Sequence, residues 1–177
     1  MKWEILIVGR GGQGVLLLGH VIGVAAAKYA KLYVTGTEAY ASETRGGESR
    51  SDVIISDNPE DVDFVKVRSA NVALFMYPYN IDSYLNLLNP NAYVFIDATY
   101  FKESPKGPWK LFKTPYTEIA EKTLGNPRVG NMVALGHIIG RTKMLNPEHV
   151  EKAIEELIPE KWINLNIEAF RKGLKEL

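Results

Sequence analysis

A glycine-rich turn between two apolar segments, close to the start of the chain, restricts the possible folds more than any other feature of the sequence. Residues 3–8, WEILIV, form a short and continuous apolar run, which is typical of a strand buried on both faces. In the stretch VGRGGQGV that follows, Gly9, Gly11 and Gly14 fit the pattern G-x-G-x-x-G. An apolar helix is predicted beyond them, over residues 15–30. A strand, a glycine turn and a helix in this order indicate a backbone that can approach a ligand closely.

Segments of strand character alternate with segments of helical character along the rest of the chain. Such alternation predicts the α/β class, with an open, mostly parallel sheet and helices on both faces in a three-layer, Rossmann-like arrangement. No linker divides the sequence, so we expect residues 1–177 to form one domain. Residues 99–110, with two prolines and a glycine, are expected to form a hairpin or a surface excursion. Further strands are expected at 32–37, 51–56, 71–76 and 92–98, and further helices at 80–89, 115–125, 131–144, 146–159 and 167–177.

The composition excludes several classes of function. Lys+Arg and Asp+Glu both number 21, so the net charge is zero, which argues against a broad nucleic-acid or anionic-membrane surface. The apolar run at 15–27 is shorter than the ~20 residues that a bilayer span needs, and no signal peptide is visible, so we expect a cytoplasmic protein. Cysteine is absent, which excludes disulfides, cysteine nucleophiles and thiolate-bound iron–sulfur clusters on this chain. Three scattered histidines do not predict a metal site.

Three interpretations of the glycine turn remain open on the residues alone. The pyrophosphate of a dinucleotide would bind at the helix N-terminus, and Glu38 lies about where the acid for the ribose hydroxyls is expected. Another phosphate-bearing cofactor would use the same backbone. The third interpretation is a turn that serves packing only. A nucleoside-triphosphate P-loop is excluded, because Val15 occupies the position of the required lysine.

The second unusual stretch is SETRGGESR at residues 42–50, which is expected to form a loop. Its charged residues alternate in sign around Gly46 and Gly47. An arginine near two glycines, Arg45 or Arg50, can present its planar donors to a phosphate or a carboxylate. The alternative is a solvated loop with surface ion pairs. Because this loop and the glycine turn both leave from the carboxyl ends of strands, we expect them to meet at one edge of the sheet.

Taken together, the two loops resemble those of a known family. The turn GRGGQGV and the stretch EAYASETRGGESRSDVIISDNP, with VGNMVALGHIIG at 129–140, resemble the gamma subunit of the 2-oxoacid:ferredoxin oxidoreductases over nearly the whole chain. The second loop is most similar to that of the 2-oxoglutarate branch. Ala41 and Ser42 stand where that branch has Gly-Pro, so branched-chain 2-oxoacids and pyruvate remain alternatives.

The resemblance implies a subunit of a larger enzyme. Such enzymes oxidatively decarboxylate a 2-oxoacid with coenzyme A to an acyl-CoA and pass the electrons to ferredoxin. Thiamine diphosphate and the iron–sulfur clusters are expected on other subunits, which agrees with the missing cysteines. The implied partners are alpha, beta and ferredoxin-like delta subunits. This chain is expected to be inactive alone, to carry no catalytic residue, to assemble the complex and to help hold coenzyme A.

Both loops are expected to contribute to the face towards the catalytic subunits and coenzyme A. Arg45 or Arg50 is the candidate cation for a coenzyme A phosphate. The competing hypothesis from the residues is a stand-alone NAD(P)- or nucleotide-binding protein, which would bind its ligand without partners. The candidate residues are Gly9, Gly11, Gly12, Gln13 and Gly14 from the turn, and Glu43, Arg45, Gly46, Gly47 and Arg50 from the second loop.

Overall fold

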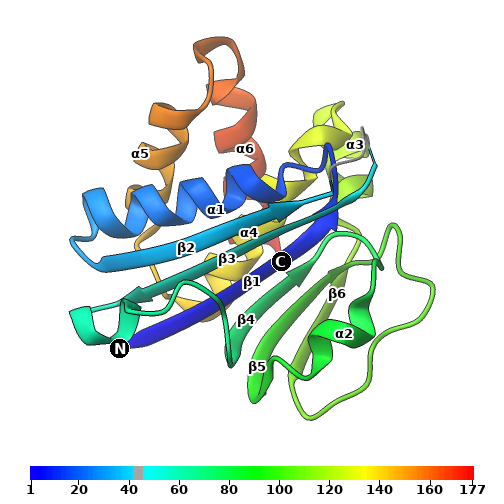
Figure 1. Ribbon diagram of the computed structural model, residues 1–177. Coiled ribbons are helices and arrows are strands. Elements are labelled where there is room, and N and C mark those ends of the chain that lie inside the picture. Colours follow the sequence, from blue (N-terminus) through cyan, green and yellow to red (C-terminus); the bar gives the residue numbers. More distant parts are fainter. Residues whose placement is uncertain (42–45) are drawn as a thin grey trace.

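The computed structural model of the protein describes residues 1–41 and 46–177. A central sheet of six strands runs through these residues in the order β2-β3-β1-β4-β5-β6 (Figure 1). The apolar runs form the central strands, which are buried on both faces, whereas the outer strands β2 and β6 are half-buried or exposed. The strands are β1 (Lys2–Arg10), β2 (Tyr33–Tyr40), β3 (Glu48–Ser56), β4 (Ala70–Phe75), β5 (Leu88–Asp97) and β6 (Lys110–Thr114).

All strands except β3 run in the same direction. Strand β3 pairs antiparallel with both β1 and β2, whereas β1–β4, β4–β5 and β5–β6 are parallel pairs. The mostly parallel α/β fold predicted from the sequence is thereby confirmed. Residues 41–47 are too few for the crossover that a parallel pair requires, about a dozen residues, so β2 and β3 form a hairpin. Strand β3 therefore separates β1 from β2.

Helices cover the two faces of the sheet unequally (Figure 1). The face carrying Ile5 and Ile7 packs against α1 and α3–α6, and the face carrying Leu6 and Val8 packs against the short helix α2 and connecting segments. Among the described residues, no helix is long and apolar enough to cross a bilayer. The helices are α1 (Val15–Val24) with a π-helical turn (Ala25–Tyr29), α2 (Ile81–Leu85), α3 (Tyr116–Leu124), α4 (Gly130–Thr142), α5 (Pro147–Leu157) and α6 (Glu160–Glu176), with 3₁₀ turns at Pro59–Val62 and Pro127–Val129.

The elements differ from the sequence expectations in several places, and α6 begins at Glu160 rather than at residue 167. Strand β6 starts at the end of the stretch expected to be a hairpin or a surface excursion. The sequence does not reveal this short edge strand, because prolines and a glycine directly precede it. The helix expected at 80–89 is limited to α2, since β5 already begins at Leu88. Pro90 falls where the β4–β5 register shifts, so its missing N–H removes no ladder hydrogen bond. The expected loop at 42–50 is also shorter, because β3 begins at Glu48.

Helices α4 and α6 cross with their backbones in close contact. A Cβ atom added to Gly173 would lie 2.9 Å from the backbone nitrogen of His137, and one added to Gly136 would lie 2.7 Å from that of Leu174. Ordinary contacts of a Cβ atom begin at 3.4 Å, so glycine is required on both helices. This crossing fixes the position of α4, whose first turn carries residues of the site described next.

Candidate functional site

The glycine turn connects the carboxyl end of β1 to the N-terminus of α1. Gly14 caps the helix in the left-handed conformation, with φ of 74°. Its carbonyl oxygen accepts a hydrogen bond of 3.3 Å from Nδ2 of Asn131, in the first turn of α4. A Cβ atom at this position would collide with the Asn131 amide. Both the backbone conformation and the neighbouring helix therefore require glycine here.

Gln13 holds the turn closed with both ends of its side-chain amide. Its Oε1 accepts a hydrogen bond of 2.7 Å from the backbone N–H of Arg10. Its Nε2 donates a hydrogen bond of 3.1 Å to the carbonyl oxygen of Met76, the residue that follows β4. The amide thus joins the carboxyl ends of two adjacent parallel strands, and its first role is to shape the turn.

The second loop meets the turn, as the sequence predicts. The N–H of Gly11 donates a hydrogen bond of 2.7 Å to the carbonyl oxygen of Gly47. A Cβ atom on Gly11 would lie 3.3 Å from the backbone nitrogen of Gly46, so the two backbones are almost in contact. The hydroxyl of Tyr79, which follows β4, donates to the carbonyl oxygen of Gly46. Segments from three parts of the sequence therefore converge at this edge of the sheet.

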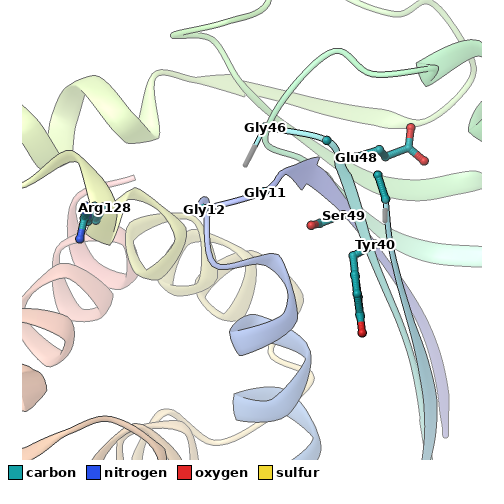
Figure 2. Close-up of a pocket in the computed structure, with 9 residues that line it drawn as sticks. Gly11, Gly12, Tyr40, Gly46, Glu48, Ser49 and Arg128 are labelled. Carbon is teal, nitrogen blue, oxygen red and sulfur yellow. The ribbon is translucent and has the colours of Figure 1, made fainter. Parts of the chain in front are cut away.

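A cavity of about 640 Å³ opens between these segments. Figure 2 shows that Ser49 and Tyr40 lie on the side of Gly11 and Gly12, whereas Glu48 points away from them. The Glu48 carboxylate instead accepts hydrogen bonds from the hydroxyl of Tyr84 and, at 3.1 Å, from the side chain of Asn80. The lining consists of Gly11, Gly12, Tyr40, Ala41, Gly46, Gly47, Glu48, Ser49 and Arg128.

Arg50 is not in a loop, and its guanidinium is engaged within the fold. It lies in β3 and forms a bidentate pair with Asp52, with nitrogen–oxygen distances of 2.6 and 2.8 Å. Asp52 is fully buried and also accepts the N–H of Val67 at 2.9 Å. The hydrogen bonds to Asp52 raise the pKa of Arg50. Because neighbouring strand residues point to opposite faces, Arg50 shares the side of Glu48 and not that of Ser49. These contacts assign it to the fold rather than to a ligand.

The other residues predicted from the sequence differ in where they lie. Glu43 and Arg45 lie outside the described residues. Gly9 lies beneath the turn, where a Cβ atom would come within 2.8 Å of Cγ2 of Val15, so it provides packing space. The remaining glycines of both loops line the cavity, with the exception of Gly14, which holds the start of α1.

Arg128 and Asn131 reach the site from a distant part of the sequence and are absent from the set predicted from it, as are the lining residues Tyr40, Ala41, Glu48 and Ser49. Arg128 lies in the 3₁₀ turn before α4 and lines the large cavity together with two smaller hollows of about 200 and 290 Å³, each of which also contacts Gly12. The dipeptide Asn126–Pro127 marks a helical start in the sequence, because Asn126 accepts the N–H of Arg128 at 3.0 Å. That signal places Arg128 at an element end but gives no sign that it reaches the glycine turn.

The acid expected for a dinucleotide ribose lies away from the turn. Glu38 belongs to β2, which β3 separates from β1, and it pairs with His20 on α1. In a dinucleotide-binding fold the acid follows the strand next to the glycine turn. The structure therefore does not favour the dinucleotide interpretation.

His137 is a titratable residue, but it is buried in the core and does not line the cavity at the sheet edge. Its Nδ1 lies 2.8 Å from the Tyr116 hydroxyl, and Nε of Arg141 donates to its Nε2 at 3.3 Å. A guanidinium nitrogen only donates, so Nε2 accepts, and the proton of the neutral ring resides on Nδ1. Burial, with a smaller effect of the Arg141 charge, lowers the pKa of His137 to about 4. In the described part of the chain, no group of three or more His, Asp or Glu side chains is arranged to hold a metal ion.

Comparison with known proteins finds relatives over almost the whole chain. The profile of the family described as "Pyruvate ferredoxin/flavodoxin oxidoreductase" matches residues 4–176. The 2-oxoglutarate synthase subunit KorC of Methanocaldococcus jannaschii is 34% identical over 175 residues, which cover 98% of this chain and 92% of that protein. KorC of Methanothermobacter marburgensis is 35% identical over 179 residues, with coverages of 98% and 95%.

Solved structures share the fold. The gamma subunit of a keto/oxoacid ferredoxin oxidoreductase from Geobacter sulfurreducens PCA is 29% identical, with a TM-score of 0.85, and the match covers 98% of this chain and 97% of that one. A 2-oxoglutarate:ferredoxin oxidoreductase from Magnetococcus marinus, with 2-oxoglutarate, coenzyme A and succinyl-CoA bound, is 21% identical, with a TM-score of 0.84. There the match covers 99% of this chain but 31% of the other, so the same fold occurs as part of a longer chain.

Proposed function

The chain belongs to the pyruvate ferredoxin/flavodoxin oxidoreductase family, and from this premise we propose that it is the gamma subunit of a 2-oxoglutarate:ferredoxin oxidoreductase. The complex would decarboxylate 2-oxoglutarate oxidatively with coenzyme A and pass the electrons to ferredoxin in the cytoplasm. The observation that carries this proposal is the likeness to KorC subunits over nearly the full length of both chains. The stand-alone nucleotide-binding alternative is not favoured, because the separation of Glu38 from the turn removes its main support.

The chemistry of the complex is proposed to reside on other subunits. Thiamine diphosphate supplies an electron sink for decarboxylation, and iron–sulfur clusters carry the electrons. The sequence contains no cysteine, so this chain has no thiolate ligands for a cluster. At the sheet edge, the side-chain amides of Gln13 and Asn131 are committed to shaping the turn. The proposed partners are therefore the thiamine- and cluster-bearing alpha, beta and delta subunits, with ferredoxin as the acceptor.

The sheet edge is the proposed contact with these partners and with coenzyme A. The cavity of about 640 Å³ is within the range of ligand pockets, roughly 300–1,000 Å³. It is lined by the bare backbone of Gly11, Gly12, Gly46 and Gly47 and has an arginine at its margin, which fits a phosphate-bearing ligand. Since Arg50 is paired within the fold, Arg128 and Arg45 are the candidate cations. Replacing either by Ala in the assembled complex should raise the KM for coenzyme A.

The test of the function is to tag this chain in its native host, purify it gently and assay the co-eluting proteins for viologen reduction. Each 2-oxoacid is supplied with and without coenzyme A. Cluster-bearing partners and a reduction that requires both 2-oxoglutarate and coenzyme A would support the proposal. Activity with another 2-oxoacid would retain the family assignment and refute the substrate. A chain that elutes without partners and binds NAD(H) would refute the subunit role.

A further inference from the structure

A second, smaller hollow lies on the other side of the glycine turn. Its volume is about 200 Å³, and it opens where β1, β4 and β5 end. The glycine turn, the beginning of α4 and Met76, the residue after β4, all line it. It is lined by Arg10, Gly11, Gly12, Gln13, Met76, Tyr100, Thr117, Pro127, Arg128 and Asn131.

Arg10 is held in this hollow by aromatic rings. Its guanidinium carbon lies 4.6 Å from the ring centre of Tyr77 and 5.3 Å from that of Tyr100, and the two rings are 5.1 Å apart. Within the described part of the chain, no side chain or carbonyl accepts a hydrogen bond from this guanidinium. Stacking on rings fixes the plane of an arginine and leaves the N–H groups at its edge available.

Arg128 contributes a second positive charge to the same hollow. It is exposed, and in residues 1–41 and 46–177 it has no ion pair. None of the described residues that line the hollow is acidic. The buried carboxylate of Asp97 contacts the lining residue Thr117, but it is engaged within the fold: it accepts the N–H and hydroxyl of Thr117 at 3.3 and 2.5 Å and the N–H of Thr99 at 3.1 Å. Two arginines therefore line a space to which the described part of the chain adds no carboxylate.

The size of the hollow indicates what kind of anion it can take. Pockets for cofactors and drug-sized ligands have volumes of roughly 300–1,000 Å³, so 200 Å³ is better matched by one side chain than by a coenzyme. A carboxylate suits the arginine fork, since it can accept two parallel hydrogen bonds. The surroundings also suit a protein partner: the rings of Tyr77 and Tyr79 contact each other at a tilt, with centres 4.8 Å apart, beside the exposed Pro78, and tyrosine and arginine are enriched in interface centres.

We propose that this hollow receives an aspartate or glutamate side chain from a partner subunit, which inserts between Arg10 and Arg128. The inference rests on the proposed function, because it requires a complex. The inference adds a specific interaction to the proposed function: the two arginines anchor the subunit interface through a carboxylate that the partner supplies. Arg10, which its contacts with two aromatic rings already order, loses little freedom when the partner binds.

The test measures the dissociation constant between the full chain and its partner subunits for the wild type, Arg10→Met and Arg128→Met. Methionine keeps much of the apolar stem and removes the charge. Arg68→Met is the matched control, because Arg68 also stacks on an aromatic ring, that of Phe64 at 3.4 Å, but lies outside the hollow. Each of the first two variants should raise the dissociation constant at least tenfold and weaken its dependence on salt, whereas Arg68→Met should match the wild type.

Several results would overturn the inference. Wild-type affinity in both hollow variants would do so, as would an equal loss in Arg68→Met. Unchanged affinity with a raised KM for coenzyme A would assign the hollow to a small-molecule phosphate instead. Circular dichroism of each variant separates a folding defect from a binding defect, and Arg10→Lys keeps the charge if Arg10→Met fails to fold. A wild-type chain with no oxidoreductase partner would refute the proposed function itself, a result distinct from variants that bind like the wild type.

Discussion

The crossing of α4 and α6 allows a quantitative prediction for Gly173→Ala. The new Cβ atom would lie 2.8 Å from the carbonyl carbon of Val133 and 2.9 Å from the backbone nitrogen of His137, and closer still to the oxygen of Val133. All three atoms belong to the backbone of α4, so no side chain can rotate away. To relieve the contact with the oxygen of Val133 the helices must separate by about one ångström or more, and overpacking of this kind costs roughly 1–3 kcal/mol.

Gly23→Ala is the matched control, because it is also a glycine-to-alanine change within a helix. At Gly23 the added atom would meet only Cγ1 of Val34, at 3.9 Å, which is an ordinary contact. Alanine there should gain up to about 1 kcal/mol from helix propensity and from the lower entropy of the unfolded chain. Both variants share this gain, so the difference between them isolates the collision. We expect their free energies of unfolding to differ by roughly 1–3 kcal/mol.

The assay is thermal unfolding followed by circular dichroism, supported by urea titration. In a chain of this size 1 kcal/mol corresponds to about 2–4 °C in Tm. Gly173→Ala should therefore melt several degrees below Gly23→Ala and below the wild type. A Gly173→Ala protein that melts at or above the temperature of Gly23→Ala would show that the two helices are not in backbone contact, and the packing argument would then be wrong.

Three further variants probe other contacts of the fold. The pKa of His137 is lowered to about 4, below its ordinary value in the unfolded chain, so the unfolded state binds more protons and stability should fall by up to about 1.4 kcal/mol per unit as the pH drops from about 6.5 towards 4. His137→Gln should flatten that dependence in denaturant titrations across this range, and an unchanged slope would contradict the assignment. Asp52→Asn leaves the Arg50 guanidinium without its buried partner and should cost about 3 kcal/mol in urea unfolding, a loss that Asp57→Asn at the surface should not show. Gln13→Ala removes two partly buried hydrogen bonds and should cost about 1–2 kcal/mol, with faster hydrogen exchange at the N–H of Arg10; protection equal to the wild type there would refute the role of the amide.

The parts of the fold that the sequence predicts are those encoded by neighbouring residues. The strand, turn and helix around Gly11 are local, and the meeting of the two loops follows from the rule that ligand-binding loops leave one edge of a parallel sheet. The reversed direction of β3 depends on the length of its connection to β2, which the apolar pattern does not report. Strand β6 is five residues long and half-buried, so its composition resembles that of a loop.

The site was predictable only in part, for a similar reason. The glycines of the site can be recognised from the sequence, because few other sequences produce such a bare backbone. The charge of Arg50 and its neighbours in sequence predict a loop, but Arg50 lies in a strand and its guanidinium binds the buried Asp52, two positions further along. Arg128 reaches the turn from more than 100 residues away in sequence, and only the packing of α4 against α1 and α6 brings it there.

The contact of α4 with α6 also has a consequence for how the protein opens. The first turn of α4 supplies Asn131 to the glycine turn, while the rest of that helix lies against α6 at the C-terminal end of the chain. Detachment of α6 would uncover one side of α4 and so remove the support of the distant turn. The last helix and the glycine turn therefore belong to one cooperative unit, and their amide protons should exchange with a common opening free energy.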